Sequence, residues 1–184
     1  MKFIKTAIPD VCIIEPSVFG DDRGYFLESF NLEKFEENIF PIKFVQDNES
    51  KSSRGVLRGL HFQKPPFAQA KLVRCIEGCV IDVAVDIRKG SPTYGKHVSV
   101  ELSGENKRQL FVPTGFAHGF SVLSETAVFA YKVDNRYAPE SDSGIRYDDK
   151  ELNINWGLNE EDIQLSFKDK ELESFKNLDS PFKF

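Results

Sequence analysis

The stretch from Arg54 to Arg88 sets ionisable side chains among apolar residues at strand-like spacing. His61 stands in the run GLHFQ, and Lys71 opens the run KLVRC. Charged groups in such positions are costly unless they are paired or used, and lysine is almost never fully buried unpaired. Lys71 therefore needs an anion, a carboxylate or a substrate oxygen as its partner. This stretch is the first place to look for chemistry.

Two later runs repeat the pattern of one polar group on an apolar face. His118 alternates in step with the apolar residues of HGFSVL, and Tyr131 does the same in VFAYKV. Taken singly, such a histidine is more often a packed core residue, and a buried tyrosine usually bonds its hydroxyl locally. Their joint occurrence with His61 and Lys71 favours an interior that holds a ligand over one filled only by side chains.

The relative orientation of Arg58 and His61 is open from sequence. Strict alternation over residues 56–63 places the two side chains on opposite faces of a strand. Gly59 lies between them, and a glycine inside a strand often marks a bulge that re-aims a side chain. A bulge there would bring both groups to one face.

Short alternating runs separated by close turns indicate an all-β fold. Strand-like runs of roughly five to eight residues recur without a strand–helix–strand rhythm. Asn31 is placed to cap a short helix that reaches Ile39, and the tail run SFKDKELESF predicts another. The chain is expected to form a β-barrel or sandwich with a few short peripheral helices, as one domain over residues 1–184.

The pair Glu77-Gly78 is expected to form a hairpin turn that brings Cys75 and Cys79 close together. With Cys12 these residues make three cysteines, an odd count that indicates reduced thiols in a cytosolic protein. Free cysteine behaves as a small hydrophobe. Each of the three is therefore expected to pack in the core.

The composition indicates which class of partner the protein binds and in which compartment it works. The formal net charge is −5, which argues against nucleic acid or an anionic membrane as the main partner. No apolar run reaches membrane-spanning length, and the first residues do not read as a signal peptide. We expect a cytoplasmic protein whose partner is a small molecule.

A metal site is the main rival to metal-free chemistry. His61 and the PTGFAHGF run around His118 resemble the two histidine motifs of metal-binding cupin barrels. Those sites draw a second histidine two residues after the first, and here that position is Gln63. Two histidines are too few for a stable site without added carboxylates. The barrel is expected to hold no metal.

Long motifs give the chain a more specific resemblance. QDNESKSSRGVLRGLHFQ, the run from KLVR to RKGSPTYG, and VPTGFAHGFSVLS followed by YKV resemble the dTDP-4-dehydrorhamnose 3,5-epimerase family. The likeness extends from FGDDRGYFLESF to LSFKDKEL. It implies a cupin-like jelly roll, a homodimer, no cofactor, and a dTDP-4-keto-6-deoxy sugar as substrate.

The same resemblance implies roles for four residues. Protons on C3 and C5 of the sugar lie α to the ketone, so removing one gives an enolate that needs a base, an acid and a stabilised oxyanion. His61 would be the base, Tyr131 the acid on the opposite face, and Lys71 the cation near the C4 oxygen. Asp169 would hold the tautomer and orientation of His61. Asp82 and Asp86 are the fallback candidates for that partner.

Binding roles follow by resemblance as well, and some of these residues are expected to act across a dimer interface. Arginine suits the diphosphate through charge-assisted hydrogen bonds, and Tyr137 matches an aromatic residue that stacks on thymine. The positions implied to bind the nucleotide sugar are Arg23, Glu28, Gln46, Asp47, Asn48, Arg58, Lys71, His118, Tyr137, Asp142 and Lys168.

One departure from the family pattern leaves the number of epimerised carbons open. After the stacking aromatic the family often reads Pro-x-x-Glu-Arg-Gly, and here the run is PESDSG, with Asp142 and Ser143. A shorter carboxylate and a lost cation would alter the contacts at this rim. An epimerase acting at one carbon, a non-catalytic nucleotide-sugar-binding barrel and a metal-dependent cupin are the alternatives.

Overall fold

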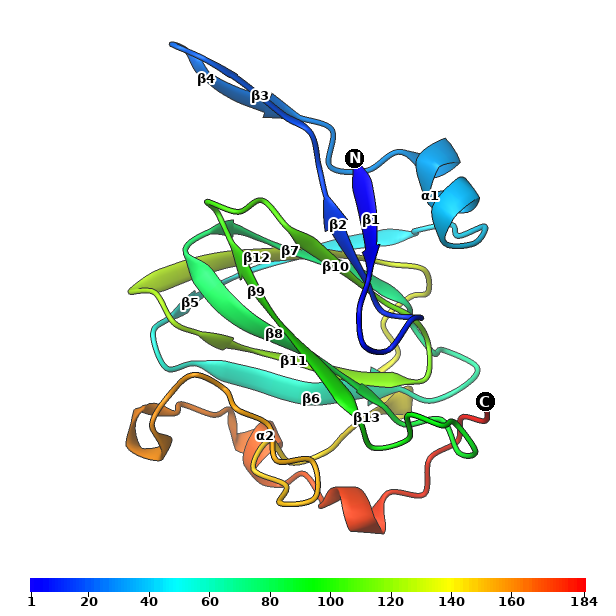
Figure 1. Ribbon diagram of the computed structural model, residues 1–184. Coiled ribbons are helices and arrows are strands. Elements are labelled where there is room, and N and C mark those ends of the chain that lie inside the picture. The colour runs from blue at the N-terminus through cyan, green and yellow to red at the C-terminus, as the bar shows by residue number, and fades with distance from the viewer.

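The computed structural model describes residues 1–184 and shows two antiparallel sheets that face each other (Figure 1). The first sheet has the order β1-β2-β10-β7-β12-β5 and the second the order β13-β6-β11-β8-β9. The strands of the first sheet are β1 (Lys2–Lys5), β2 (Cys12–Glu15), β5 (Gln46–Ser53), β7 (Lys71–Glu77), β10 (Gln109–Val112) and β12 (Thr126–Val133). Those of the second are β6 (Leu57–Gln63), β8 (Cys79–Asp86), β9 (His97–Ser103), β11 (Phe116–Val122) and β13 (Asp142–Gly144). The predicted all-β sandwich is confirmed.

A separate hairpin and a few short helices complete the chain. Strands β3 (Val18–Asp21) and β4 (Gly24–Leu27) pair only with each other and stand away from the two sheets (Figure 1). The helices are α1 (Leu32–Asn38) and α2 (Phe167–Lys170), with 3₁₀ turns at Pro139–Ser141, Glu160–Asp162 and Phe175–Asn177. None of these helices has the length and apolar character that a membrane crossing requires.

Helix α1 begins where the sequence predicts. The side-chain oxygen of Asn31 accepts a hydrogen bond from the backbone N–H of Lys34 at 3.2 Å, which satisfies one of the free donors of the first turn. Phe35 is fully buried against the first sheet, while Leu32 stays 47% exposed. The helix therefore packs on the sheet through Phe35, and Leu32 lies outside this contact.

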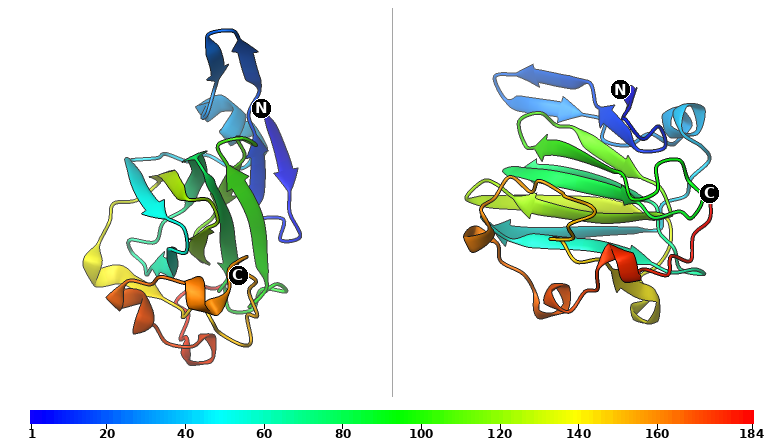
Figure 2. Two further views of the ribbon diagram at one scale, coloured as in Figure 1. Left: turned by 90° about the vertical axis from the view of Figure 1, so that its left-hand side faces the viewer. Right: turned by 60° about the horizontal axis from the view of Figure 1, so that its bottom comes forward.

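Alternation along β8 divides its side chains between two cores. Val80 and Ala84 point between the sheets, where Val98 and Val100 of β9 meet them. Val83 belongs to a second cluster on the other face of the second sheet, together with residues such as Trp156 and Phe175 from the C-terminal segment. Figure 2 shows this segment, orange to red, running along that side of the sandwich. The long tail thus covers a sheet face that would otherwise expose apolar surface.

The expected hairpin at Glu77-Gly78 is wrong. Strand β7 pairs with β10 and β12, whereas β8 pairs with β11 and β9, so the turn joins the two sheets at a corner. Gly78 has a φ of +82°, and a Cβ there would lie 2.1 Å from the carbonyl oxygen of Thr126. Only glycine fits this corner. All three cysteines are free, with Cys12 and Cys75 buried and Cys79 partly exposed.

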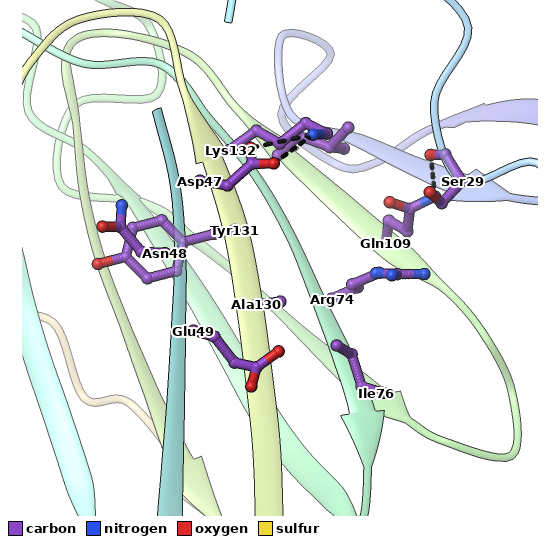
Figure 3. Close-up of a pocket in the computed structure, with 11 residues that line it drawn as sticks. Ser29, Asp47, Asn48, Glu49, Arg74, Ile76, Gln109, Ala130, Tyr131 and Lys132 are labelled. Carbon is purple, nitrogen blue, oxygen red and sulfur yellow. Dashed lines mark hydrogen bonds and ion pairs between the residues drawn. The ribbon is translucent and has the colours of Figure 1, made fainter. Parts of the chain in front are cut away.

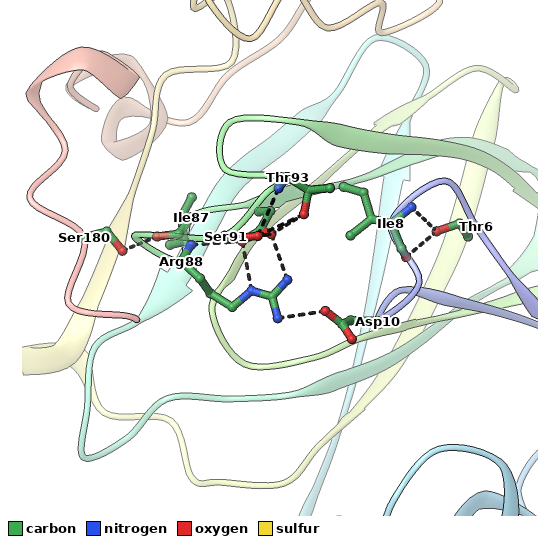
Figure 4. Close-up of polar contacts among 9 residues, drawn as sticks. Thr6, Ile8, Asp10, Ile87, Arg88, Ser91, Thr93 and Ser180 are labelled. Atoms are coloured by element: carbon green, nitrogen blue, oxygen red, sulfur yellow. Dashed lines mark hydrogen bonds and ion pairs between the residues drawn. The ribbon is translucent and has the colours of Figure 1, made fainter. Parts of the chain in front are cut away.

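A cluster around Arg88 closes one end of the sandwich (Figure 4). Arg88 donates to Asp86 at 2.7 and 2.9 Å, pairs with Asp10 at 2.8 Å, and lies over the rings of Phe116 and Phe184. Burial raises the pKa of Asp86, but hydrogen bonds from Arg88, Ser91 and Thr93 outweigh it and bring the pKa to about 2. Asp86 is fully engaged here, so it is not a partner for His61.

Candidate active site

Two adjoining cavities open between the sheets and share His61, Lys71 and Tyr131. The inner cavity measures about 480 Å³ and the outer one, at the rim, about 340 Å³. His61 comes from β6 in the second sheet, whereas Lys71 and Tyr131 come from β7 and β12 in the first. The three groups predicted to do chemistry therefore meet in one place, from facing walls.

His61 is held by a carboxylate from the C-terminal segment. Its Nε2 lies 2.5 Å from Oδ1 of Asp169, a residue 108 positions away in sequence and only 4% exposed. Ser166 caps α2 by accepting from the Asp169 N–H and donates its hydroxyl to Oδ2 at 2.7 Å. Burial raises the pKa of Asp169, but the hydrogen bonds from His61 and Ser166 hold it below the usual value. An ionised Asp169 fixes Nε2–H on the imidazole and leaves Nδ1 without a protein partner.

Arg58 and His61 lie on the same side of β6, which answers the question left open by alternation. His61 pairs with His118 of β11 and Arg58 pairs with Phe120, so two residues of β6 oppose a single residue of β11 between these pairs. This irregularity brings both side chains to the inner cavity. Arg58 also donates to the hydroxyl of Ser52 at 3.1 and 3.3 Å.

Lys71 and Tyr131 have protonation equilibria that suit opposite tasks. Burial lowers the pKa of Lys71 to about 8, and the nearby charges of Asp82 and Asp142 oppose that fall. Lys71 therefore remains largely an ammonium at neutral pH. Burial raises the pKa of Tyr131, with Arg58 acting against the rise. The phenol keeps its proton at neutral pH and can donate it to a reacting atom.

The rim of the site is polar. Gln46 and Asn48 line the outer cavity, and the amide of Gln46 donates to the Asn48 side chain at 2.8 Å. The hydroxyl of Tyr137 donates to Asp142 at 3.1 Å, and Lys168 forms an ion pair with the same carboxylate. Tyr137 remains 51% exposed, so one aromatic ring is available at the mouth of the cavity.

Asp47 lines neither the inner nor the outer cavity. Alternation along β5 directs Gln46 and Asn48 inward and Asp47 outward, where it pairs with Lys132 at 2.9 Å. Figure 3 shows this pair at a cavity of about 290 Å³ whose lining includes Arg74, Leu72 and Ile76 of β7. Since Val73 and Cys75 point to the core between the sheets, this cavity lies on the outer face of the first sheet.

Arg23 and Glu28 also lie outside the site of their own chain. Arg23 pairs with Asp21 at the exposed end of the β3–β4 hairpin, and Glu28 pairs with Lys34 of α1. Neither lines any of the cavities described above. Nucleotide binding by these two residues stays a prediction, and within a single chain the structure gives it no support.

Other residues at the cavities had no predicted role. Gln69 lines the outer cavity, and Glu49 and Ser50 line the inner one, where Phe120 and Phe129 stack at 4.1 Å. The inward parity of Ser50 with Asn48 was a usable signal for Ser50. Gln69 follows a proline-rich loop, and no spacing in the sequence indicates where it points.

The structure offers no ready metal site. No group of three or more His, Cys, Asp or Glu side chains lies close enough together to hold an ion. His61 and His118 each direct Nε2 to a different carboxylate, Asp169 and Asp82. The absence of a resident metal stays a prediction that metal analysis of the purified protein tests.

Comparisons with known proteins identify the family of this chain. A family model described as dTDP-4-dehydrorhamnose 3,5-epimerase matches residues 5–177. The protein of that name from Shigella flexneri is 57% identical over 97% of this chain and 98% of its own length.

Solved structures agree as well. The dTDP-6-deoxy-D-glucose-3,5-epimerase of Legionella pneumophila, in complex with dTDP-4-keto-L-rhamnose, superposes with a TM-score of 0.93 at 52% identity, covering 97% of this chain and 94% of that one. The enzyme from Elizabethkingia anophelis gives 0.91 at 57% identity, covering 96% and 97%. The fold is therefore the cupin-like jelly roll that the motifs implied. The chain belongs to the dTDP-4-dehydrorhamnose 3,5-epimerase family.

Proposed function

We propose that this protein is an isomerase that inverts C3 and C5 of dTDP-4-dehydro-6-deoxy-D-glucose to give dTDP-4-dehydro-L-rhamnose, without a cofactor. The observation that carries the proposal is the placement of His61 with Asp169 on one wall of a cavity and Tyr131 with Lys71 on the facing wall. Family membership supplies the substrate class.

The geometry supports a proton-transfer mechanism through an enolate. Nδ1 of His61 removes the proton from a carbon next to the C4 ketone, and the electron pair of that bond moves to the C4 oxygen. The ammonium of Lys71 stabilises the negative charge on this oxygen. Tyr131 returns a proton to the same carbon from the opposite face, which inverts it. Asp169 stabilises the imidazolium that forms at His61.

The rim residues fit the nucleotide end of the substrate. We assign Arg58 and Lys168 to the diphosphate, since cations form the strongest hydrogen bonds to phosphate oxygens. Gln46, Asn48 and Asp142 supply polar contacts at the outer cavity. The exposed ring of Tyr137 is placed to stack on the thymine base.

The experiment that tests this function is isotope exchange. The protein is incubated with dTDP-4-keto-6-deoxyglucose in heavy water, and deuterium is located in the sugar by NMR. We expect deuterium at both C3 and C5. Incorporation at one carbon would identify a single-carbon epimerase, the second candidate that the PESDSG departure leaves open. Binding of dTDP without any exchange would contradict catalysis and favour a binding barrel.

We further propose that the working form is a homodimer. The β3–β4 hairpin exposes apolar side chains, with Phe19 64% and Phe26 69% exposed, and patches of this kind mark interfaces. The hairpin carries Arg23, which is remote from its own cavity. A second copy that receives the hairpin would bury these rings and bring Arg23 to the nucleotide site of the partner.

Light scattering during size exclusion tests the dimer. We expect twice the chain mass, and we expect Phe19→Ser with Phe26→Ser to give monomers that bind dTDP more weakly. Phe167→Ser, which changes an 82% exposed ring elsewhere, is the control and should leave the mass unchanged. A fully active monomer would refute the proposal. The three free cysteines also fit the cytoplasm, which is reducing.

A further inference from the structure

Gln63 stands where a metal-binding cupin would need its second histidine, and here it is a buried amide bonded to the backbone. It is the last residue of β6 and is 4% exposed. Its Nε2 donates to the backbone carbonyls of Phe67 at 2.6 Å and Arg136 at 3.1 Å. Its Oε1 accepts from the backbone N–H of Ala138 at 2.8 Å. Both donors of the amide are therefore used on two loops at the rim of the outer cavity.

Two of these hydrogen bonds hold the backbone on either side of Tyr137. The carbonyl of Arg136 belongs to the peptide unit that precedes Tyr137, and the N–H of Ala138 belongs to the unit that follows it. Because peptide units are planar, fixing both of them restricts the two backbone torsions of the residue between them. Residues 134–138 lie in no strand or helix. The amide of Gln63 thus sets the direction in which the ring leaves the chain.

The third hydrogen bond joins a second loop to the same unit. Residues 64–70 connect β6 to β7, and the side chain of Asn135 donates to the carbonyl of Pro66 in this loop at 3.1 Å. The side chain of Gln69 donates in return to the carbonyl of Asn135 at 2.8 Å. Asn135 and Gln69 are partly exposed, whereas Gln63 is buried. The two loops form one hydrogen-bonded rim that is anchored in the interior by Gln63.

The ring of Tyr137 has few other contacts to hold it in place. It is 51% exposed at the mouth of the outer cavity, and its one side-chain hydrogen bond joins the hydroxyl to Asp142 at 3.1 Å. Ordering a free side chain or loop when a ligand binds costs free energy, so a ring already held in position binds more tightly. The anchor beneath the ring therefore affects how well a planar group stacks on it.

Resting on the proposed function, we propose that Gln63 is a positioning residue for nucleotide recognition, which holds Tyr137 where its ring stacks on the base of a nucleoside diphosphate. The proposal accounts for the residue type at this position. An amide supplies two donors and an acceptor from one planar group, whereas a neutral imidazole has a single donor and a carboxylate has none. Only a primary amide makes all three backbone bonds.

Calorimetry with dTDP tests the proposal through a double-mutant cycle. Gln63→Met keeps the length of the side chain but removes all three hydrogen bonds, and we expect Kd to rise by about three- to tenfold, the cost of ordering the ring. Tyr137→Ala removes the stacking ring and should raise Kd by about 5- to 150-fold. In the Tyr137→Ala background Gln63→Met should add less than about twofold, because both changes act on one contact.

The cycle separates positioning from general support of the cavity. If the two changes multiply, or if either single change leaves Kd unaltered, Gln63 does not act through the ring and the proposal is overturned. With dTDP-4-keto-6-deoxyglucose the loss should appear in KM, because the base lies away from the reacting carbons. A fall in kcat with KM unchanged would also overturn the proposal. A wild-type protein that does not bind dTDP would instead refute the proposed function.

Ser180→Ala is the matched control. Ser180 is 4% exposed, and its hydroxyl also fastens the backbone, since it donates to the carbonyl of Ile87 and accepts from the N–H of Phe182 at the closed end of the sandwich. The variant should lower the midpoint of urea unfolding and leave Kd for dTDP unchanged. An equal rise in Kd for Ser180→Ala and Gln63→Met would show a general loss of stability and contradict a positioning role.

Gln63→Glu decides the matter if Gln63→Met does not fold. It keeps the size of the side chain and the bond from the N–H of Ala138, but its carboxylate cannot donate to the two carbonyls. We expect Kd for dTDP to rise by about three- to tenfold here as well, and this rise should disappear in the Tyr137→Ala background. A rise that persists in that background would overturn the proposal.

Discussion

The cavity between the sheets and the closed end around Arg88 both contain buried carboxylates, but they leave different atoms free. Asp86 is bonded to Arg88, Ser91 and Thr93. In the cavity each histidine bonds one carboxylate and leaves Nδ1 without a protein partner. A buried polar group whose hydrogen bonds are all made within the protein stabilises the fold. A buried group that keeps one atom without a protein partner can act on a ligand.

The largest effect should follow from removing the base. His61→Ala deletes the imidazole, and we expect the rate of product formation to fall by about 10²- to 10⁴-fold. The affinity for dTDP, measured by calorimetry, should change little because the nucleotide is assigned to the rim. A variant that turns over at the wild-type rate would refute the base assignment. A loss of dTDP affinity that matches the loss of rate would indicate a binding role.

The next largest effect should follow from removing the ammonium of Lys71, on the wall of the cavity that faces His61. Lys71→Met keeps the apolar stem but removes the ammonium, and we expect kcat to fall by about 10²- to 10³-fold, as when an oxyanion donor is lost. In the wild type, kcat should also decline as pH rises through about 8, because the pKa of Lys71 lies there and the ammonium loses its proton. The residual activity of Lys71→Met should lack that decline. A profile that is the same in both proteins would contradict the assignment.

The Arg88 cluster should respond in stability instead of rate. Arg88→Met breaks a largely buried pair and leaves the carboxylate of Asp86 without its cation, so we expect the free energy of unfolding to fall by about 3 kcal/mol. Urea unfolding measures this change, and kcat per folded protein should stay near the wild-type value. The matched control is Arg23→Met, which removes an equally charged but exposed side chain of the hairpin and should leave unfolding of the chain nearly unchanged.

Local sequence patterns were enough to predict much of the fold. Alternation predicted the all-β fold, and Asn31 marked the start of α1 because capping depends on residues three positions apart. The same local rules predicted the wrong connection at Glu77-Gly78. A tight turn requires glycine whether it joins two strands of one sheet or two sheets at a corner, so pairing partners far along the chain decide between them.

The site was less accessible from local patterns. Strict alternation places Arg58 and His61 on opposite faces of β6, and one extra residue in the strand brings them to the same face. Gly59 is the only sign of this irregularity in the sequence. The contact between His61 and Asp169 spans 108 positions, so it came from family resemblance and not from spacing. Asp82 was considered as a partner of His61 and instead holds His118, because the order of strands in the second sheet sets which groups are neighbours.

The smallest expected effect is the change in the stability of the fold that follows when Asp86 of the Arg88 cluster is protonated in acid. The folded pKa of Asp86, about 2, lies below the unfolded value of about 3.9. Its ionised form therefore stabilises the protein above about pH 4, and this contribution is lost as pH falls from there through about 2. Asp86→Asn removes that titration, so its stability should depend less on pH in this window than that of the wild type. The midpoint of urea unfolding, measured between pH 5 and pH 2 for both proteins, gives the difference. If the midpoint changes with pH equally in both proteins, titration of Asp86 does not contribute to acid unfolding.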